Sequence, residues 1–380
     1  MKATAANQLT GVWSWPFVCD GCQHPYPTGG FPFRCPVCGG LFEFAKPLPV
    51  PDLDPRGRSP RGLARFRQAF PLPPGAPFVS LGEGGTPLVP VEIAGCRVHF
   101  KCEHLNPTGS FKDRGTAVLV SALAAAGVRE AVEDSSGNAG ASFAAYAAKA
   151  GIRARVFVPA YASGPKRDQI GHYGAELVSV PGPRSKATEE VLRAVESGAT
   201  YASHNYLPHG QAGMATMAFE MVEQLGRAPG AVIMPVGQGT LLLGISRGFE
   251  ALKSQGVIDR EPQLVGVQAR ACAPIWAVHT MGSAGLAWVR EGETAAEGIR
   301  TARPLRGDAV LRRVEQSGGK MLAVEEEDIL AGRDALSRKG FYIETTSAVV
   351  WPALQTVLNE LPGPLVVVLT GSGFKQADTQ

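Results

Sequence analysis

The stretch "EAVEDSSGNAGASFAAYAAKAG", residues 130–151, places a short strand-like segment, a polar loop and an alanine-rich helical segment in direct succession. Strands that alternate with helices are typical of parallel sheets with crossover helices. The alternation therefore predicts an α/β fold. It recurs along the chain, with further strands predicted at "CRVHFKCE" (96–103), "RARVFVP" (153–159), "AELVSV" (175–180), "AVIMPVG" (231–237), "QLVGVQA" (263–269) and "PLVVVLTGSG" (364–373).

Length and composition indicate a globular enzyme of several structural units. A chain of 380 residues exceeds the size at which a single core stops growing, and its hydrophobic and charged fractions, 44% and 19%, are ordinary. The net charge of +3, with both signs interspersed, gives no electrostatic footprint for nucleic acid or a membrane surface. Because the amino terminus lacks the apolar core of a signal peptide, we expect a cytoplasmic protein with a small-molecule partner.

The loop "SSGNAG", residues 135–140, follows a predicted strand and opens a helix. Ligands of α/β folds lie at the carboxyl ends of strands. The hydroxyls of Ser135 and Ser136, the Asn138 amide and the backbone amides near Gly137 would make a cradle for a carboxylate or another anion. The structural alternative, a helix cap with turn glycines, accounts for only one serine and one glycine of this run.

Two further loops follow predicted strands. In "VGQGTLLLG" (236–244), the backbone amides of Gly237, Gln238, Gly239 and Thr240 would face a phosphate at the start of a helix. The run lacks the third glycine of a dinucleotide fingerprint and the ending of a P-loop, which favours one phosphorylated cofactor over a nucleotide. In "LTGSG" (369–373), hydroxyls after the last apolar strand are suited to bond a ring nitrogen.

A lysine stands at the start of another small-residue helix. In "NPTGSFKDRG", residues 106–115, Lys112 comes after a turn and before an apolar stretch. Burial there would lower the lysine pKa, which prepares the amine for a Schiff base. Asp113 and Arg114 are predicted to form an ion pair at the helix start, and a direct catalytic role is the alternative. A lysine for an aldehyde, a phosphate loop, an asparagine for a phenolic oxygen and a hydroxyl for a pyridine nitrogen together complement pyridoxal 5'-phosphate.

Four cysteines near the amino terminus have the spacing of a zinc site. They form two C-x2-C pairs separated by twelve residues, and the second pair runs into two glycines. Four thiolates can surround one zinc ion and leave no open position, which indicates a structural role. Disulfides are the alternative, which the predicted cytoplasmic location disfavours. The proposed zinc ligands are Cys19, Cys22, Cys35 and Cys38.

These motifs together resemble those of threonine synthases, within the tryptophan-synthase-like, fold type II group of pyridoxal-phosphate-dependent enzymes. The resemblance rests on "NPTGSFKDRG", "SSGNAGASFAAYAAKAGI" and "LTGSGFK", and extends to "GEGGTPL" (82–88), "ARPL" (302–305), "GFYIETTSAV" (340–349) and the cysteine pairs. It implies two domains with twisted, mostly parallel sheets flanked by helices. The implied divisions are a zinc-ribbon-like segment (1–48), a proline-rich linker (49–75), a large cofactor-binding domain (76–124 and 206–380) and a small domain (125–205).

The resemblance also implies roles for individual residues. Lys112 would hold the cofactor as a Schiff base and move substrate protons, with Phe111 packed near the cofactor. Ser135, Ser136 and Gly137 would bind the substrate carboxylate, while Asn138 would bond the cofactor's phenolic oxygen. Thr370 would face the pyridine nitrogen, and its neutral hydroxyl favours elimination of a β or γ leaving group over transamination. The phosphate would be held by Gly237, Gln238, Gly239 and Thr240.

One segment departs from the family pattern. Threonine synthases are expected to hold the phosphate of phosphohomoserine partly through Asn-Ser-x-Asn-Pro-x-Arg-Leu, whereas this chain has "YASHNYLPHGQAGMAT" (201–216). Gly210 falls about where the arginine belongs, so a bidentate phosphate partner is missing. His204, Asn205 or His209 would contact a less anionic leaving group; alternatively these are ordinary loop residues.

Three functions are therefore predicted. The first is a threonine synthase-like lyase that eliminates or replaces a β or γ leaving group on an amino acid. The second is an ammonia-lyase or eliminase that acts on threonine, serine or diaminopropionate. The third is a zinc-ribbon binding protein without catalysis, which the retained Lys112 and Asn138 disfavour. The sequence does not give the oligomeric state, and a homodimer stays open.

Overall fold

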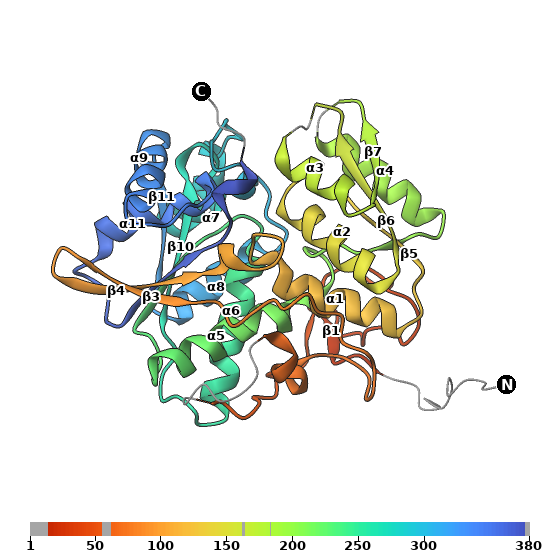
Figure 1. Cartoon of the computed structure of the whole chain (residues 1–380), viewed down its shortest axis with the longest axis horizontal. Coiled ribbons are helices and arrows are strands. Elements are labelled where there is room, and N and C mark those ends of the chain that lie inside the picture. The colour runs from red at the N-terminus through yellow and green to blue at the C-terminus, as the bar shows by residue number, and fades with distance from the viewer. Residues whose placement is uncertain (1–13, 55–61, 162–163, 183, 377–380) are drawn as a thin grey trace.

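The larger of two sheets has six strands in the order β11-β10-β9-β12-β4-β3 (Figure 1). Neighbouring strands run parallel, except that β3 pairs antiparallel with β4. Every residue of β9 and β12 is buried, which explains why both strands are apolar without interruption. The strands span β3 Leu88–Ile93, β4 Cys96–Cys102, β9 Ala231–Pro235, β10 Gln263–Ala269, β11 Lys320–Val324 and β12 Leu365–Leu369.

The smaller sheet has four parallel strands in the order β7-β6-β5-β8, and it forms a separate lobe in Figure 1. This computed structural model describes residues 14–54, 62–161, 164–182 and 184–376. The chain enters the smaller lobe after α1 and leaves it before α5, so the large lobe is built from two separate parts of the sequence. The strands span β5 Glu130–Glu133, β6 Arg153–Pro159, β7 Glu176–Val180 and β8 Thr200–Tyr201.

Helices connect and cover the strands. The helix α1 contacts both α2 and α5, so it lies where the two lobes meet (Figure 1). The α-helices span α1 Lys112–Ala125, α2 Asn138–Ala150, α3 Pro165–His172, α4 Arg184–Glu196, α5 Gln211–Leu225, α6 Thr240–Ser254, α7 Pro274–Met281, α8 Gly307–Gln316, α9 Glu326–Ser337, α10 Thr345–Ala348 and α11 Val350–Val357. Short 3-10 helices span η1 Leu63–Ala69, η2 Glu103–Leu105, η3 Pro208–Gly210, η4 Arg270–Cys272, η5 Gly282–Trp288, η6 Glu297–Ile299 and η7 Gly373–Lys375.

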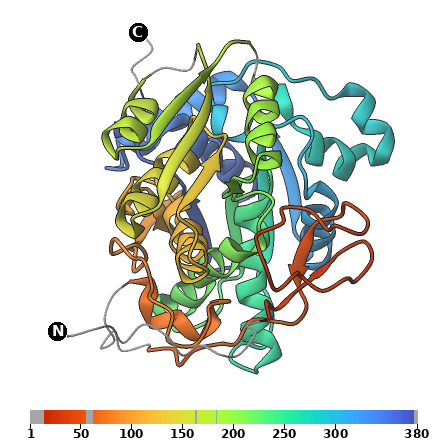
Figure 2. The same ribbon diagram turned by 90° about the vertical axis from the view of Figure 1, so that its right-hand side faces the viewer.

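The amino-terminal residues 14–48, named here the cysteine segment, form a small body of loops around two short antiparallel strands. These strands are β1 Phe17–Cys19 and β2 Phe42–Phe44. Figure 2 shows the segment in red on the outside of the molecule beside green helices. The contact with α6 includes an ion pair between Glu43 and Arg247. The cysteine segment is therefore attached to the large lobe.

Part of the predicted linker packs against the core. The sequence predicts an extended linker over residues 49–75, but Leu63, Phe66 and Ala69 of η1 are buried. The Phe66 ring lies 5.6 Å from the ring of Phe219 in α5, measured between centroids. The backbone is kinked at Phe66 (φ −94°, ψ 16°), so Leu63, Phe66 and Ala69 reach the core from two short turns. The neighbouring prolines hide these turns in the sequence.

The predicted α/β fold is confirmed strand by strand for the segments quoted above, and so are the helices after "SSGNAG" and "VGQGT". Sequence analysis missed the antiparallel β3, the two-residue β8 and the strand β11. None of the helices in the described part of the chain is long and apolar enough to cross a membrane.

Candidate active site

Lys112 stands at the first position of α1, beside the end of the central strand β12. The Phe111 amide donates to the Thr370 carbonyl at 3.0 Å, and Ser110 forms a β-bridge with Gly371. Among the described residues, half-buried Lys112 forms no hydrogen bond or ion pair, and its Nζ lies 4.8 Å from the centre of the Phe111 ring. Burial lowers the Lys112 pKa to about 8, against the attraction of Glu133 and Glu344. The predicted effect of burial on this lysine is therefore confirmed.

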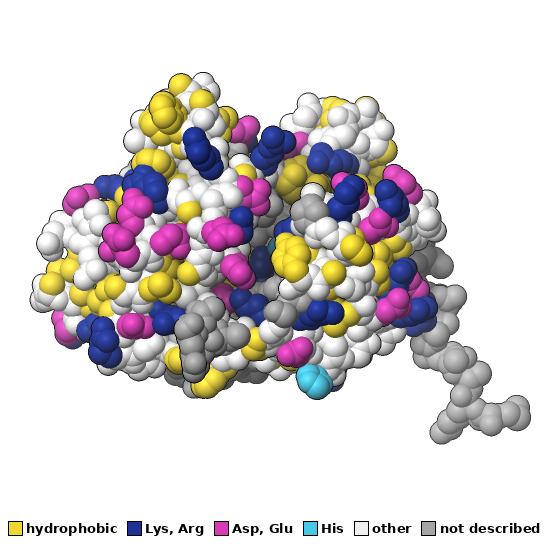
Figure 3. Space-filling view, turned by 90° about the horizontal axis from the view of Figure 1, so that it is seen from above, with side chains coloured by type: hydrophobic (Ala, Val, Ile, Leu, Met, Phe, Trp, Pro, Cys, Tyr) yellow, Lys and Arg dark blue, Asp and Glu magenta, His cyan; other side chains and the backbone are white. Residues whose placement is uncertain are grey.

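A small cavity joins Lys112 to two other elements. Its walls include Thr116 of α1, Met214 of α5, His204 from the preceding loop and Thr240 at the start of α6. The cavity holds about 10 Å³, so side chains pack closely around the lysine. The structure thus brings the predicted lysine and one predicted phosphate-loop residue to one place. A larger cavity of about 710 Å³ lies between the lobes, against residues 106–109 and Lys375, and Figure 3 shows the hollow between them from above.

The glycine-rich loop before α6 has the geometry of an anion cradle. Gly239 adopts a left-handed conformation with φ of 88°, and a Cβ there would lie 2.2 Å from a Val310 methyl carbon. No side chain caps the amino terminus of α6. The first amides of a helix have no partner within the helix, so these amides are available to a phosphate. The Gln238 side chain instead accepts a hydrogen bond from the Leu305 amide at 2.9 Å.

The loop "SSGNAG" faces a buried carboxylate of the large lobe. Asn138 Nδ2 donates to both oxygens of Glu344, at 2.9 and 3.1 Å, while its buried Oδ1 has no partner among the described residues. Lys166 of the small lobe approaches the same carboxylate at 2.8 Å. Within the loop, the Gly137 amide donates to the Ser135 hydroxyl at 3.2 Å, and Ser136 is half-buried. Glu344 therefore links the loop to the large lobe, a role that sequence analysis did not assign to it.

Thr370 belongs to the same connected group. Its hydroxyl lies 2.8 Å from the hydroxyl of Ser347, which also accepts a hydrogen bond from the Thr370 amide. Ser347 lies in α10, and Glu344 immediately precedes that helix. The chain of contacts from Thr370 through Ser347 and Glu344 to Asn138 gathers residues far apart in the sequence.

Buried Glu133 and half-buried His204 form a pair that sequence analysis missed. Nδ1 of His204 lies 3.1 Å from Oε1 of Glu133, and the other Glu133 oxygen accepts a hydrogen bond from the Ser135 amide. Burial raises the Glu133 pKa to about 7, against the opposing effects of Ser135, Arg184 and Lys112. Burial also holds the His204 pKa well below its usual value. Glu133 ends a strand just before the loop, and an acidic residue at that place was the available signal.

Asn205 and His209 lie apart from the Lys112 cavity in the structure. The main-chain oxygen of Asn205 accepts a hydrogen bond from Arg306 Nε at 3.3 Å, and its buried Oδ1 has no partner among the described residues. His209 is completely buried, with its ring 4.6 Å from that of Trp15 in the cysteine segment. Of the three polar residues predicted in this loop, His204 alone lines the cavity with Lys112.

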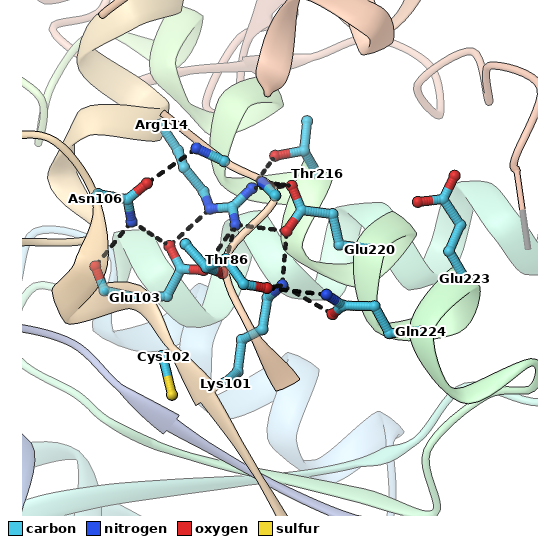
Figure 4. A network of polar contacts seen from close by, with 12 residues as sticks. Thr86, Lys101, Cys102, Glu103, Asn106, Arg114, Thr216, Glu220, Glu223 and Gln224 are labelled. Carbon is cyan, nitrogen blue, oxygen red and sulfur yellow. Dashed lines mark hydrogen bonds and ion pairs between the residues drawn. The ribbon is translucent and has the colours of Figure 1, made fainter. Parts of the chain in front are cut away.

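The predicted ion pair between Asp113 and Arg114 is wrong. Consecutive residues of a helix do not face each other, and here each is buried with different partners. Asp113 accepts hydrogen bonds from the Thr108 amide and hydroxyl and from the Ser142 hydroxyl, at 2.6 to 2.7 Å. Figure 4 shows Arg114 between two carboxylates, which it contacts at 2.7 to 2.8 Å. These carboxylates belong to Glu103 and Glu220.

The four predicted zinc ligands meet in the cysteine segment. Their sulfur atoms all lie within 4.8 Å of one another, with 3.3 Å between Cys19 and Cys38 and 3.7 Å between Cys22 and Cys35. Four sulfurs around one zinc ion would lie about 3.8 Å apart, from a zinc–sulfur distance of about 2.3 Å. Gly40 has no room for a side chain, because a Cβ there would lie 2.8 Å from the Cys19 sulfur. The cluster fits a metal ion.

Comparison with known proteins defines the class to which this fold and site belong. Residues 79–371 match the family described as "Pyridoxal-phosphate dependent enzyme", and the chain belongs to this family. It is 33% identical to the threonine synthase of Mycobacterium tuberculosis over 84% of this chain and 90% of that protein. It is 32% identical to the threonine synthase of Methanocaldococcus jannaschii over 95% of this chain and 93% of that protein.

Solved structures agree with this membership. A threonine deaminase from T.th. has 30% sequence identity and a TM-score of 0.63, over 78% of this chain and 94% of that chain. Maize serine racemase, at 20% identity and a TM-score of 0.65 over 77% and 89%, shows the shared fold alone. The chain is thus a threonine synthase-like, pyridoxal-phosphate-dependent lyase with the predicted fold type II architecture. The binding protein without catalysis is no longer a candidate.

Proposed function

We propose that Lys112 holds pyridoxal phosphate covalently and that the enzyme eliminates or replaces a β leaving group on a compact amino acid. The position of Lys112 carries this proposal. Its amine is half-buried and without a polar partner among the described residues, and its pKa is lowered to about 8. A lysine with these properties is suited to bond an aldehyde and to exchange protons near neutral pH.

The surrounding residues fit the cofactor. The uncapped start of α6, with the glycine turn of Gly237 and Gly239, suits a phosphate group held by amides of Gln238 and Thr240. The side-chain oxygen Oδ1 of Asn138 is buried without a hydrogen-bond partner among the described residues, which leaves it for a contact with the bound cofactor. Thr370 offers a neutral hydroxyl for the ring nitrogen, and Phe111 offers an apolar ring beside the lysine.

The residues of this chain would divide the chemistry among them. When bound, pyridoxal phosphate withdraws electrons from the substrate α-carbon. The Lys112 amine would take the α-proton and return it to the β-carbon or the leaving group. The amides and hydroxyls of Ser135, Ser136 and Gly137 would orient the substrate carboxylate. His204, a neutral imidazole beside Glu133 and Lys112, would relay a proton from the Glu133 carboxyl to a departing group.

A less anionic leaving group is favoured over the phosphate of phosphohomoserine because the loop before α5 contains no arginine. A side chain at Gly210 would be crowded, since a Cβ there would lie 3.0 Å from the Gly115 carbonyl oxygen. No arginine lies between Arg193 and Arg227. Loss of one buried phosphate partner would cost about 2 to 5 kcal/mol, which lowers affinity by roughly one and a half to three and a half orders of magnitude.

Reduction with borohydride tests the cofactor assignment. The purified enzyme is expected to show visible absorbance from the bound cofactor, and reduction should attach it to the peptide that contains Lys112. The control is Lys149→Ala, which removes an exposed lysine of α2 and should leave the label in place. A label on another lysine would refute the assignment.

A substrate panel tests the leaving group. Phosphohomoserine, serine, threonine, O-phosphoserine and diaminopropionate are compared at equal concentrations by steady-state turnover and by the cofactor spectrum. We expect a β-substituted amino acid to be turned over fastest. Efficient threonine formation from phosphohomoserine, ahead of every β-substituted substrate, would overturn the proposal.

The similarity to threonine deaminase favours a second candidate, an ammonia-lyase that acts on threonine, serine or diaminopropionate. The two candidates differ in their products. An ammonia-lyase releases a keto acid and ammonia without a second substrate, whereas a replacement enzyme needs an added nucleophile. Keto-acid release, measured with and without candidate nucleophiles, separates them.

We also propose that Cys19, Cys22, Cys35 and Cys38 bind one structural zinc ion in the cytoplasm. The sulfur distances and the seven free cysteines support this assignment. Elemental analysis should find one zinc per chain, which is lost in the double variant Cys35→Ser, Cys38→Ser. The control Cys96→Ser changes a cysteine outside the cluster and should retain the metal. A metal-free wild-type protein would contradict the assignment.

A further inference from the structure

The cysteine segment packs against residues 204–210, the loop that carries His204. His209, near the end of this loop, is enclosed by aromatic rings of the segment, 4.6 Å from Trp15 and 4.7 Å from Phe17. Tyr206 lies 5.3 Å from the ring of Phe33 and 5.2 Å from the guanidinium of Arg34. Both ring nitrogens of His209 are buried without a hydrogen-bond partner among the described residues, so packing alone holds this side chain.

Arg306 joins the same loop to the cysteine segment by polar contacts. This residue is only 4% exposed, and its guanidinium forms an ion pair with Glu43 of the segment. It donates to the main-chain oxygens of Phe42, Asn205 and Tyr206 at 3.2 to 3.3 Å. One buried cation therefore bonds to both sides of the contact.

The positions held by Arg306 adjoin the candidate active site. Asn205 follows His204, which shares a cavity with Lys112. On its other side, Arg306 follows Leu305, whose amide is bonded by Gln238 of the proposed phosphate loop. A displacement of Arg306 would therefore move both the loop 204–210 and the turn before α6.

The cysteine segment has little regular structure to hold Arg306 and the loop without the cysteine cluster. Its two strands have three residues each. Bodies of about 40 residues seldom fold without disulfides, metal or a partner surface. The segment has two such supports, the cysteine cluster and its contact with the large lobe, so the position of Glu43 and of the aromatic rings depends in part on the cluster.

We infer that the cysteine segment is a positioning element of the active site, with Arg306 as the positioning residue that transmits its state to residues 204–210. This inference rests on the proposed active site and on the proposed zinc ion. Zinc release or loss of Arg306 is expected to loosen this loop and the Gln238 turn while the two sheets stay folded. The main kinetic consequence is weaker substrate binding, since the cofactor lysine is held by β12 instead.

Hydrogen exchange tests the coupling without any need for activity. Full-length wild type, loaded with zinc, is compared with Arg306→Met and with wild type stripped by a chelator. In both altered proteins, amide exchange in residues 204–210 should rise at least about tenfold, while β9 and β12 stay protected. Arg306→Lys should restore part of the protection, and Arg270→Met, at an exposed arginine paired with Glu325, should change nothing there.

Two outcomes would overturn the inference. In the first, the loop 204–210 stays protected in Arg306→Met. In the second, exchange rises equally in the loop and in both sheets, which would mark a merely structural role. Kinetics give a second readout: KM for the best substrate of the panel should rise about tenfold or more in Arg306→Met, with kcat within about threefold. A failure of the borohydride test would refute the proposed cofactor lysine and leave the exchange result valid.

Discussion

Lys112 and Arg114, both in the first turn of α1, hold their positive charges in opposite environments. Arg114 is completely buried, and its guanidinium nitrogens contact Glu103, Glu220, Thr86 and Thr216 (Figure 4). Although burial acts to raise them, the Arg114 charge holds the pKa values of Glu103 and Glu220 below their usual range. Lys112, two residues earlier, has no such partner among the described residues, and burial lowers its pKa to about 8.

The difference separates what holds the fold from what is left for chemistry. Around Arg114 each charge is paired, because an unpaired buried charge would cost several kcal/mol. Around Lys112 the amine and the Asn138 Oδ1 lack partners among the described residues, and Glu133 has a pKa shifted to about 7. Perturbed groups in a cavity mark functional sites, whereas saturated networks mark structure. Four predictions test this contrast.

The largest effect is expected when the amine of Lys112 is removed. Lys112→Ala should lower kcat for the best substrate by about three to four orders of magnitude, because the proton-transferring group is removed. Compared without cofactor, its unfolding free energy should stay close to that of wild type, since Lys112 makes no polar contact among the described residues. Turnover by stopped assays and denaturant unfolding measure the two quantities. An active Lys112→Ala enzyme would break the comparison.

Replacement of Arg114, whose charge is fully paired, should lower the free energy of unfolding. Arg114→Met leaves the buried carboxylate of Glu103 without its paired cation and that of Glu220 with Lys101 alone, so the unfolding free energy should fall by about 3 to 5 kcal/mol. The matched control is Arg97→Met, which breaks the exposed pair with Glu92 and should cost at most about 1 kcal/mol. Denaturant melts compare the two variants. Equal losses would show that the network contributes no more than a surface pair.

The pH dependence of stability should expose Glu133. Its pKa is about 7 in the folded protein, above the usual 4.5, so the folded state binds the proton more tightly. As pH rises from about 4.5 to 7, the unfolding free energy of wild type should therefore fall by roughly 3 kcal/mol relative to that of Glu133→Gln. Above pH 7 the difference between the two proteins should change no further. Chemical melts at several pH values measure this difference. A constant difference across the range would contradict the raised pKa.

The smallest effect is expected at the edge of the phosphate loop. Gln238→Leu removes the hydrogen bond to the Leu305 amide, which should weaken cofactor binding by about fivefold, or about 1 kcal/mol. Spectral titration of pyridoxal phosphate measures the dissociation constant. Gln316→Leu, at an exposed position of α8, serves as the control. A change of several orders of magnitude in the dissociation constant would indicate that the Gln238 side chain, rather than its backbone amide, contacts the phosphate.

Local patterns in the sequence were sufficient for the strands, the lysine at a helix start and the cysteine pairs. The strand β12 is apolar at each position because it is buried on both faces, and the lysine motif carries its own turn. The pair of Glu133 and His204 escaped prediction because it joins a strand end to a loop 71 residues away. The partners of Arg114 escaped for the same reason, since Glu220 lies 106 residues further on. Neither contact leaves a periodic signal.

The place of β12 in the large sheet has a consequence for synthesis of the chain. This strand is the last of the sheet in chain order, yet it lies between β9 and β4. Until residues 365–369 leave the ribosome, the facing edges of β9 and β4 stay unpaired, and unpaired edges invite association with other chains. The same late strand brings Thr370 and the support of Phe111. A nascent chain therefore completes its sheet centre and its candidate active site together when β12 emerges, and before that the open edges of β9 and β4 favour association with other chains.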